Sequence, residues 1–168
     1  MILHLHAAAF VSLSIVGLLL VGGCATPDDI GNADARVTPT EAAKNVPGML
    51  NHTVAWGGLI AVIKNQKDRT EIEVVAYPLD SLNAPDRYAA PTGRFIVVQA
   101  GYLETADFAP GRLITVVGTV TEARTGTVGE AKYVYPVVLA SKLNLWPQPY
   151  GERREPNIHF GIGVGIIR

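Results

Sequence analysis

Cysteine is almost absent from the sequence, since Cys24 is the single one in 168 residues. No intramolecular disulfide can therefore form. The sequence also has no marked excess of positive or negative charge, because 14 basic and 15 acidic side chains leave a net charge of −1. Proteins that follow a phosphate backbone usually carry a basic excess, so this balance predicts no nucleic-acid partner.

Groups suited to catalysis or metal binding are also scarce. Beyond residue 23 only His52 and His159 remain as histidines, and no metal-ligand spacing is present. An active site needs convergent polar groups, so the sequence predicts no catalytic residue, no metal site and no cofactor. Glu71 and Glu73 could form a carboxylate pair, but their place on an alternating strand favours a solvated face.

The first 23 residues contain no Asp, Glu, Lys or Arg, and 16 of them are apolar. Their apolar core runs from about residue 7 to residue 21, a length typical of a secretory signal and short for a membrane span. We therefore predict that residues 1–23 are a signal peptide. An uncleaved anchor is less favoured, because it needs about 20 apolar residues and flanking charges.

Small residues precede the cysteine in the run Val21, Gly22, Gly23 and Cys24. This run resembles the bacterial lipobox, which implies cleavage between Gly23 and Cys24 and acylation of the Cys24 thiol. A conventional signal peptidase site is the alternative, since Gly23 and Ala25 are small enough for it. Two or more acyl chains hold a protein stably on a membrane. Ala25 after the cysteine, where an inner-membrane retention signal has Asp, implies sorting to the outer membrane.

The segment after the cysteine changes character at residue 38. Residues 24–37 are small and polar with no apolar periodicity, which predicts a lipidated, flexible tether. Thr38, Pro39 and Glu41 then match a helical capping box with proline at the first helical position. The helix should be short, because the Pro-Gly pair at residues 47–48 is a stop signal.

Five segments rich in β-branched or alternating apolar residues predict five strands, at residues 54–63, 70–77, 94–100, 112–124 and 132–145. Residues 104–110 lie between the third and fourth predicted strands. They show no strand pattern and suit a helical turn. This order predicts an all-β fold, a small five-stranded barrel of the oligonucleotide/oligosaccharide-binding (OB) type with a short N-terminal helix. A sandwich or an open sheet is the alternative. Gly118 predicts a bend or bulge in the fourth strand.

The barrel domain is predicted to cover residues 38–150. A tail at residues 151–168 is rich in glycine, which recurs with period two near its end. Partial disorder or an intermolecular contact is favoured for this tail over a sixth strand.

Short motifs downstream of the cysteine, spread in order from Trp56 to Trp146, carry a family resemblance. They are Trp56-Gly57-Gly58 with Ile60, Thr70, Ile72-Glu73-Val74, Tyr77-Pro78-Leu79, Gly93-Arg94-Phe95, Gly101-Tyr102-Leu103, Gly111-Arg112, Thr115-Val116-Val117-Gly118, Gly129-Glu130, Tyr133 and Tyr135-Pro136. The ordered set resembles the Slp family, named for a starvation-inducible outer-membrane lipoprotein. The resemblance implies an outer-membrane lipoprotein and implies no activity.

Basic side chains are the candidates for a ligand-facing surface, because an OB barrel binds on strands two and three and on the loops after strands one and four. The candidates are Lys64, Lys67, Arg69, Arg94 and Arg112. For the last two, pairing with Glu73, Glu104 or Asp107 is favoured over anion binding. Trp56, beside two glycines, is predicted in the core rather than on a ligand platform.

These observations predict a lipoprotein of the cell outer membrane, held by lipid on the periplasmic face. Its barrel is interpreted as a non-enzymatic structural or binding module, with membrane lipid, envelope proteins or glycan as partners. An enzyme that acts on envelope glycan is the alternative, and a cleft with two opposed carboxylates would favour it.

Overall fold

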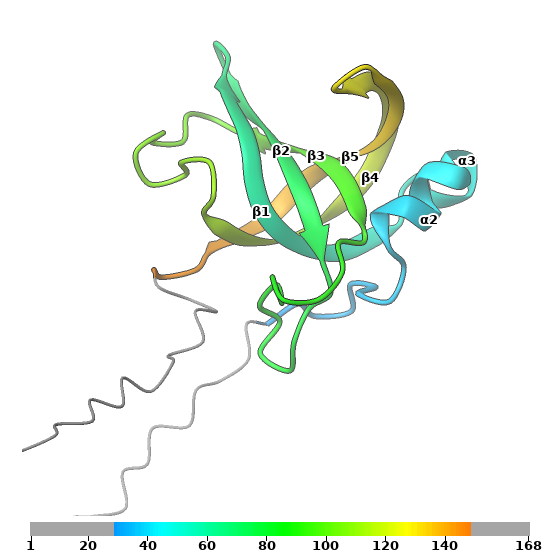
Figure 1. Ribbon diagram of the computed structural model, residues 1–168, viewed down its shortest axis with the longest axis horizontal. Coiled ribbons are helices and arrows are strands. Elements are labelled where there is room, and N and C mark those ends of the chain that lie inside the picture. Colours follow the sequence, from blue (N-terminus) through cyan, green and yellow to red (C-terminus); the bar gives the residue numbers. More distant parts are fainter. Residues whose placement is uncertain (1–28, 149–168) are drawn as a thin grey trace, which may run out of the picture.

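Residues 29–148 are described by the computed structural model. Figure 1 shows the five strands of this part of the chain, β1 (Thr53–Asn65), β2 (Arg69–Tyr77), β3 (Gly93–Ala100), β4 (Leu113–Val128) and β5 (Ala131–Leu145). The predicted signal peptide, the cleavage site at Gly23 and Cys24, and the tail at residues 151–168 lie outside the described residues.

The strands close into a barrel in the order β1-β2-β3-β5-β4. The β3–β5 pairing is parallel and the other four pairings are antiparallel. The all-β prediction and the closed small barrel are therefore confirmed. A single helical turn lies between β3 and β4, where the Phe108 N–H donates to the Glu104 carbonyl at 3.0 Å.

Alternation along the strands fills the barrel interior. On β2, Ile72 and Val74 are fully buried, while Glu71 and Glu73 point out of the barrel. Trp56 is 4% exposed and meets the ring of Phe95 edge to face at 5.3 Å, so the prediction of a core tryptophan is confirmed. The buried cluster joins all five strands through Trp56, Ile60, Ile72, Val74, Phe95, Val97, Ile114, Val116, Val120 and Val138.

Two glycines let the strands bend and cross closely. A Cβ on Gly58 would lie 1.9 Å from the Val75 carbonyl oxygen, far inside van der Waals contact. A Cβ on Gly118 would lie 2.4 Å from the Leu139 carbonyl oxygen, and the β4–β5 register shifts at Gly118. The predicted bulge in this strand is thus confirmed.

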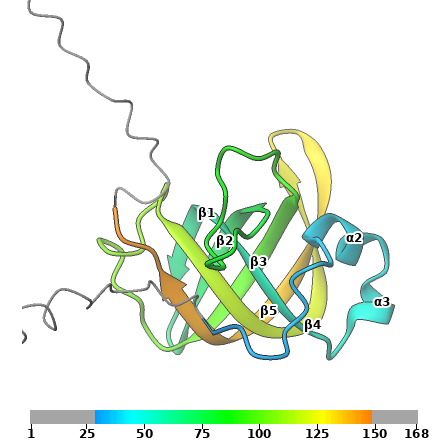
Figure 2. The ribbon, with the colours of Figure 1, turned by 90° about the horizontal axis from the view of Figure 1, so that it is seen from below.

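Two short helices, α2 (Pro39–Lys44) and α3 (Val46–Met49), lie together on one side of the barrel (Figure 2). The capping box is present, since the Glu41 N–H donates to the Thr38 hydroxyl and the Thr38 N–H donates to the Glu41 carboxylate. The prediction that Pro47 stops the first helix is wrong. Helix α2 ends at Lys44, with Asn45 as its C-cap. Pro47 lies in the first turn of α3, where a backbone N–H would have no partner within the helix.

Part of the predicted flexible tether lies against the barrel. Asp34 pairs in parallel with Val54 at the start of β1, through backbone hydrogen bonds to Thr53 and Ala55 of about 3.0 Å. The Trp56 indole N–H then donates to the Val37 carbonyl at 2.6 Å. These bonds hold residues 34–37 against the barrel. Apart from the Trp56 indole they join backbone groups, which carry no sequence pattern.

Candidate functional site

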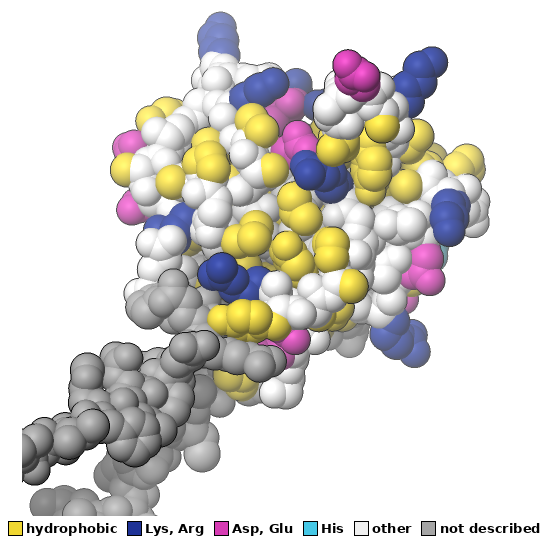
Figure 3. Space-filling model, in the orientation of Figure 1, with side chains coloured by type: hydrophobic (Ala, Val, Ile, Leu, Met, Phe, Trp, Pro, Cys, Tyr) yellow, Lys and Arg dark blue, Asp and Glu magenta, His cyan; other side chains and the backbone are white. Residues whose placement is uncertain are grey.

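A cavity of about 220 Å³ lies on the outer face of the barrel, where the β4–β5 hairpin extends past the barrel wall. Its walls come from all five strands: Val62, Lys64, Glu71, Glu73, Ile96, Arg124, Thr125, Gly126, Thr127 and Tyr135. Figure 3 shows acidic and basic side chains against each other near the centre of this face, beside hydrophobic side chains. The site is therefore a charged cleft with an apolar floor.

Tyr135 holds the hairpin against the sheet. Its ring packs over Gly126, where a Cβ would lie 3.0 Å from the ring edge, so the absence of a side chain makes room for the tyrosine. The Tyr135 hydroxyl lies 3.2 Å from the Glu73 carboxylate and 3.2 Å from the Thr127 carbonyl. A contact therefore joins β5 to β2 across the cleft.

The two β2 carboxylates are paired. Glu71 forms ion pairs with Arg124 at 2.9 Å and Arg69 at 3.2 Å, and its side chain is 14% exposed. Glu73 forms an ion pair with Arg94 at 2.7 Å and is 25% exposed. The prediction of a solvated face is wrong, because the long hairpin brings Arg124 over the outer face of β2. The predicted pairing of Arg94 with Glu73 is confirmed.

Neighbouring groups raise the pKa values of two residues of the cleft, Arg124 and Tyr135. The hydrogen bond that Arg124 donates to Glu122 raises the pKa of the Arg124 guanidinium above its usual value. The ion pair with Glu71 also raises this pKa, whereas burial lowers it. Burial raises the pKa of the Tyr135 hydroxyl, and the negative charge of Glu73 raises it further. At neutral pH Arg124 therefore stays charged and Tyr135 stays a hydrogen-bond donor.

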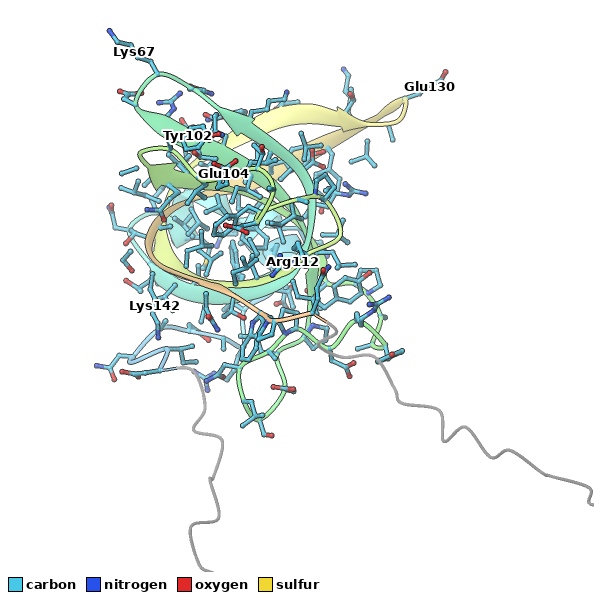
Figure 4. The ribbon with its side chains drawn as sticks, turned by 90° about the vertical axis from the view of Figure 1, so that its left-hand side faces the viewer. Lys67, Tyr102, Glu104, Arg112, Glu130 and Lys142 are labelled. Carbon is cyan, nitrogen blue, oxygen red and sulfur yellow. The ribbon has the colours of Figure 1, made fainter. Side chains whose placement is uncertain are left out.

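The five basic residues predicted to face a ligand do not lie together in the structure. Lys64 lines the cleft, Lys67 projects from the tip of the β1–β2 hairpin (Figure 4), and Arg69 and Arg94 are engaged by glutamates. Arg112 lies elsewhere and donates to the carbonyls of Asp107 and Trp146. A carboxylate partner for Arg112 was expected, but backbone carbonyls take that place.

Sequence reasoning missed the residues that make the far wall, Arg124 and Tyr135. They lie 53 and 62 residues from their glutamate partners. The sequence showed only that a basic residue and an aromatic residue lie on the same long hairpin. Nothing in their spacing pointed to β2.

A second cavity, of about 200 Å³, lies beneath the N-terminal segment. Its walls include Val37, Pro39, Trp56, Tyr77 and Leu79. These side chains are mainly apolar, and the cavity is on a different part of the barrel from the charged cleft.

Metal-binding and membrane-spanning features are absent from the described part of the chain. Residues 29–148 contain no cluster of three or more His, Cys, Asp or Glu side chains that could hold a metal ion. Neither helix in this range is long and apolar enough to span a bilayer. What the cleft offers chemically is charge, hydrogen bonding and a small apolar floor.

Comparison with known proteins places the chain. Residues 20–162 match the model of the outer membrane lipoprotein Slp family. The chain belongs to this family. The uncharacterized lipoprotein YeaY of Escherichia coli (strain K12) is 30% identical over 162 residues, covering 86% of this chain and 83% of the relative. Outer membrane protein Slp of the same organism is 28% identical over 142 residues, covering 83% of this chain and 73% of the relative.

A solved structure, that of a small single-stranded DNA-binding protein from Streptomyces coelicolor, covers 58% of this chain and 95% of its own at 16% identity. Its TM-score is 0.34, so the likeness carries no conclusion. Family membership makes the protein an outer-membrane lipoprotein, as the sequence predicts.

Proposed function

We propose that the protein is a non-enzymatic binding module, anchored by acyl chains on Cys24 and facing the periplasm. The observation that carries the proposal is the state of the cleft: both of its carboxylates are held by arginines, and the barrel behind it is filled. This arrangement favours recognition of a ligand by charge and hydrogen bonding over chemical attack on it.

The anchor would lie close to one end of the barrel. Five residue steps separate Cys24 from Asp29, the first described residue, so the two can be at most about 18 Å apart. The Asp29 carbonyl accepts a hydrogen bond from Lys142 at 2.7 Å. In Figure 4, Lys142 lies at the end of the barrel opposite the hairpin tips at Lys67 and Glu130. A membrane-anchored barrel would therefore present its charged cleft away from the lipid.

A glycan-cleaving enzyme is the alternative, and the carboxylates do not support it. Hydrolysis needs one acid and one base or nucleophile on opposite sides of the bond that breaks. Glu71 and Glu73 instead lie two residues apart on the same face of β2, each beside a guanidinium. Because both side chains leave the same face of one strand, they do not place an acid and a base on opposite sides of a bound glycosidic bond.

Incubation of purified peptidoglycan with the mature protein tests the non-enzymatic part. We expect no release of soluble fragments above the level of buffer alone. Release by the wild-type protein that is lost in a folded Glu71→Gln or Glu73→Gln variant would contradict the proposal, because loss of a catalytic acid or base typically costs about 10²–10⁴ in rate.

Labelling of a Lys67→Cys variant tests the orientation. Lys67 is an exposed tip residue, and Cys24 would be blocked by its acyl group. A maleimide that cannot cross the outer membrane should leave intact cells unlabelled and should label them after the membrane is permeabilised. Equal labelling of intact and permeabilised cells would place the barrel on the cell surface instead.

A further inference from the structure

Within the described part of the chain, one edge of the β4–β5 hairpin has no partner strand. β1 pairs with β4 only as far as Thr119, and beyond Val120 no strand of residues 29–148 pairs with β4 on that side. Pro136, which has no N–H, stands opposite Ala123 in the β4–β5 ladder, so this pair is not a hydrogen-bonded pair. By alternation, Ala123, Thr125 and Thr127 turn their backbone N–H and C=O groups away from β5.

This free edge borders the charged cleft. Thr125 and Thr127 line the cavity, and the Thr127 carbonyl already accepts the Tyr135 hydroxyl from outside the ladder. Residues 123–127 span about 13 Å at the usual rise of ~3.3 Å per residue. An extended peptide of two to four residues matches that length and could pair with the exposed backbone groups as an added strand.

The same cavity offers one group of each charge that can still form a hydrogen bond. The Lys64 ammonium group has no hydrogen-bond or ion-pair partner among residues 29–148, although the residue itself stands opposite Glu71 in the β1–β2 ladder. Glu73 uses its Oε1 atom for both Arg94 and Tyr135, while its Oε2 atom accepts no hydrogen bond from the described residues. The lining is neutral as a whole, with Lys64 and Arg124 against Glu71 and Glu73. A ligand that carries both an ammonium and a carboxylate group complements this pair.

We propose that the cleft binds a short zwitterionic peptide, which lies along the free edge of β4 with its carboxylate at Lys64 and its amino group at Glu73. Val62 and Ile96 form an apolar floor that suits small aliphatic side chains. A neutral sugar carries no charges to match this pair and cannot pair with β4 as an added strand, so the observations favour a peptide. The inference rests on the proposed binding role and names the ligand class for it.

Four probes separate the parts of the proposal. Isotopically labelled mature protein in detergent micelles is titrated with alanyl-alanine, N-acetyl-alanyl-alanine, alanyl-alanine amide and the neutral disaccharide diacetylchitobiose. Amide shifts of residues 62–64, 71–73 and 124–127 report on binding. We expect saturable shifts with alanyl-alanine, and affinity about tenfold weaker for each derivative that lacks one charge, equivalent to about 1.4 kcal/mol.

Protein variants assign the charges. Lys64→Gln should weaken binding of alanyl-alanine about tenfold and leave binding of the amide, which has no carboxylate, unchanged. Lys67→Gln is the matched control, because it removes the same charge from the tip of the same hairpin outside the cavity. Methylation of the peptide nitrogen of the probe should also weaken binding, since it removes a donor for the β4 edge without altering the protein.

Three results would overturn the inference. One is the absence of shifts with alanyl-alanine at its solubility limit, and another is equal binding of all three peptide probes. The third is saturable binding of diacetylchitobiose in the same cleft without peptide binding, which would assign the site to glycan. None of these requires fragment release from peptidoglycan, so failure here is distinguishable from failure of the non-enzymatic proposal.

Discussion

Replacement of Tyr135 by Phe tests whether the hydroxyl holds the hairpin over the cleft. The residue is 4% exposed, and its hydroxyl reaches the Glu73 carboxylate at 3.2 Å. A hydrogen bond to a charged group contributes about 1.5–3 kcal/mol, and this distance is at the long end of the range. We therefore expect the variant to lose about 1–2 kcal/mol of unfolding free energy at pH 7. Tyr102→Phe is the control, because Tyr102 is 65% exposed.

The loss should depend on pH in a defined direction. Burial and the charge of Glu73 raise the pKa of Tyr135 above its usual value near 10. The folded state then holds this proton more tightly than the unfolded state, so the contribution is fully present below pH 10 and is lost as the pH rises through the folded pKa. The difference between wild type and Tyr135→Phe should shrink above pH 10.

Urea unfolding of the chain from residue 25 onward, followed by circular dichroism at a series of pH values, measures both effects. The reasoning fails if Tyr135→Phe is as stable as wild type at pH 7. It also fails if the difference between the two proteins is the same at pH 7 and well above pH 10.

The remaining predictions concern the barrel and its cap. Phe95→Ala removes a fully buried ring that packs on Trp56, so unfolding by urea should show a loss of about 3–5 kcal/mol, and a loss under 1 kcal/mol would contradict the packing described here. Gly58→Ala would place a Cβ 1.9 Å from a backbone oxygen, so the variant should fail to fold by circular dichroism, and a native spectrum and melting temperature would refute the close crossing. Thr38→Ala removes the cap of α2 and should cost about 0.5–2 kcal/mol in the same assay, whereas an unchanged midpoint would show that the cap is dispensable.

The fold was predictable from the sequence because one face of each strand is buried inside the barrel. The alternation of Ile72 and Val74 with glutamates marks β2, and the β-branched residues of β3 mark a strand buried along much of its length. The fourth strand was predicted to end at Arg124 but continues to Val128. Beyond the barrel wall its residues pack on no core, so the hydrophobic pattern that defines a strand fades there.

The site was only partly predictable, for a different reason. Lys64, Arg69 and Arg94 could be chosen because they lie on strands or loops that an OB barrel uses for ligands. Arg124 and Tyr135 could not, because their role comes from the curvature of a long hairpin over β2. The contact of the segment before α2 with the barrel was likewise not predictable from the sequence, because that segment is held by backbone hydrogen bonds and by the indole N–H of Trp56.

Mass spectrometry of the protein purified from its native membranes tests the central claim, that a lipid on Cys24 anchors the barrel. We expect a mature N-terminus at Cys24 with a mass increase that matches two or three acyl chains. The Cys24→Ser variant should remain an uncleaved precursor without added lipid. A wild-type mature chain that begins at Cys24 or Ala25 and carries no lipid would contradict the account.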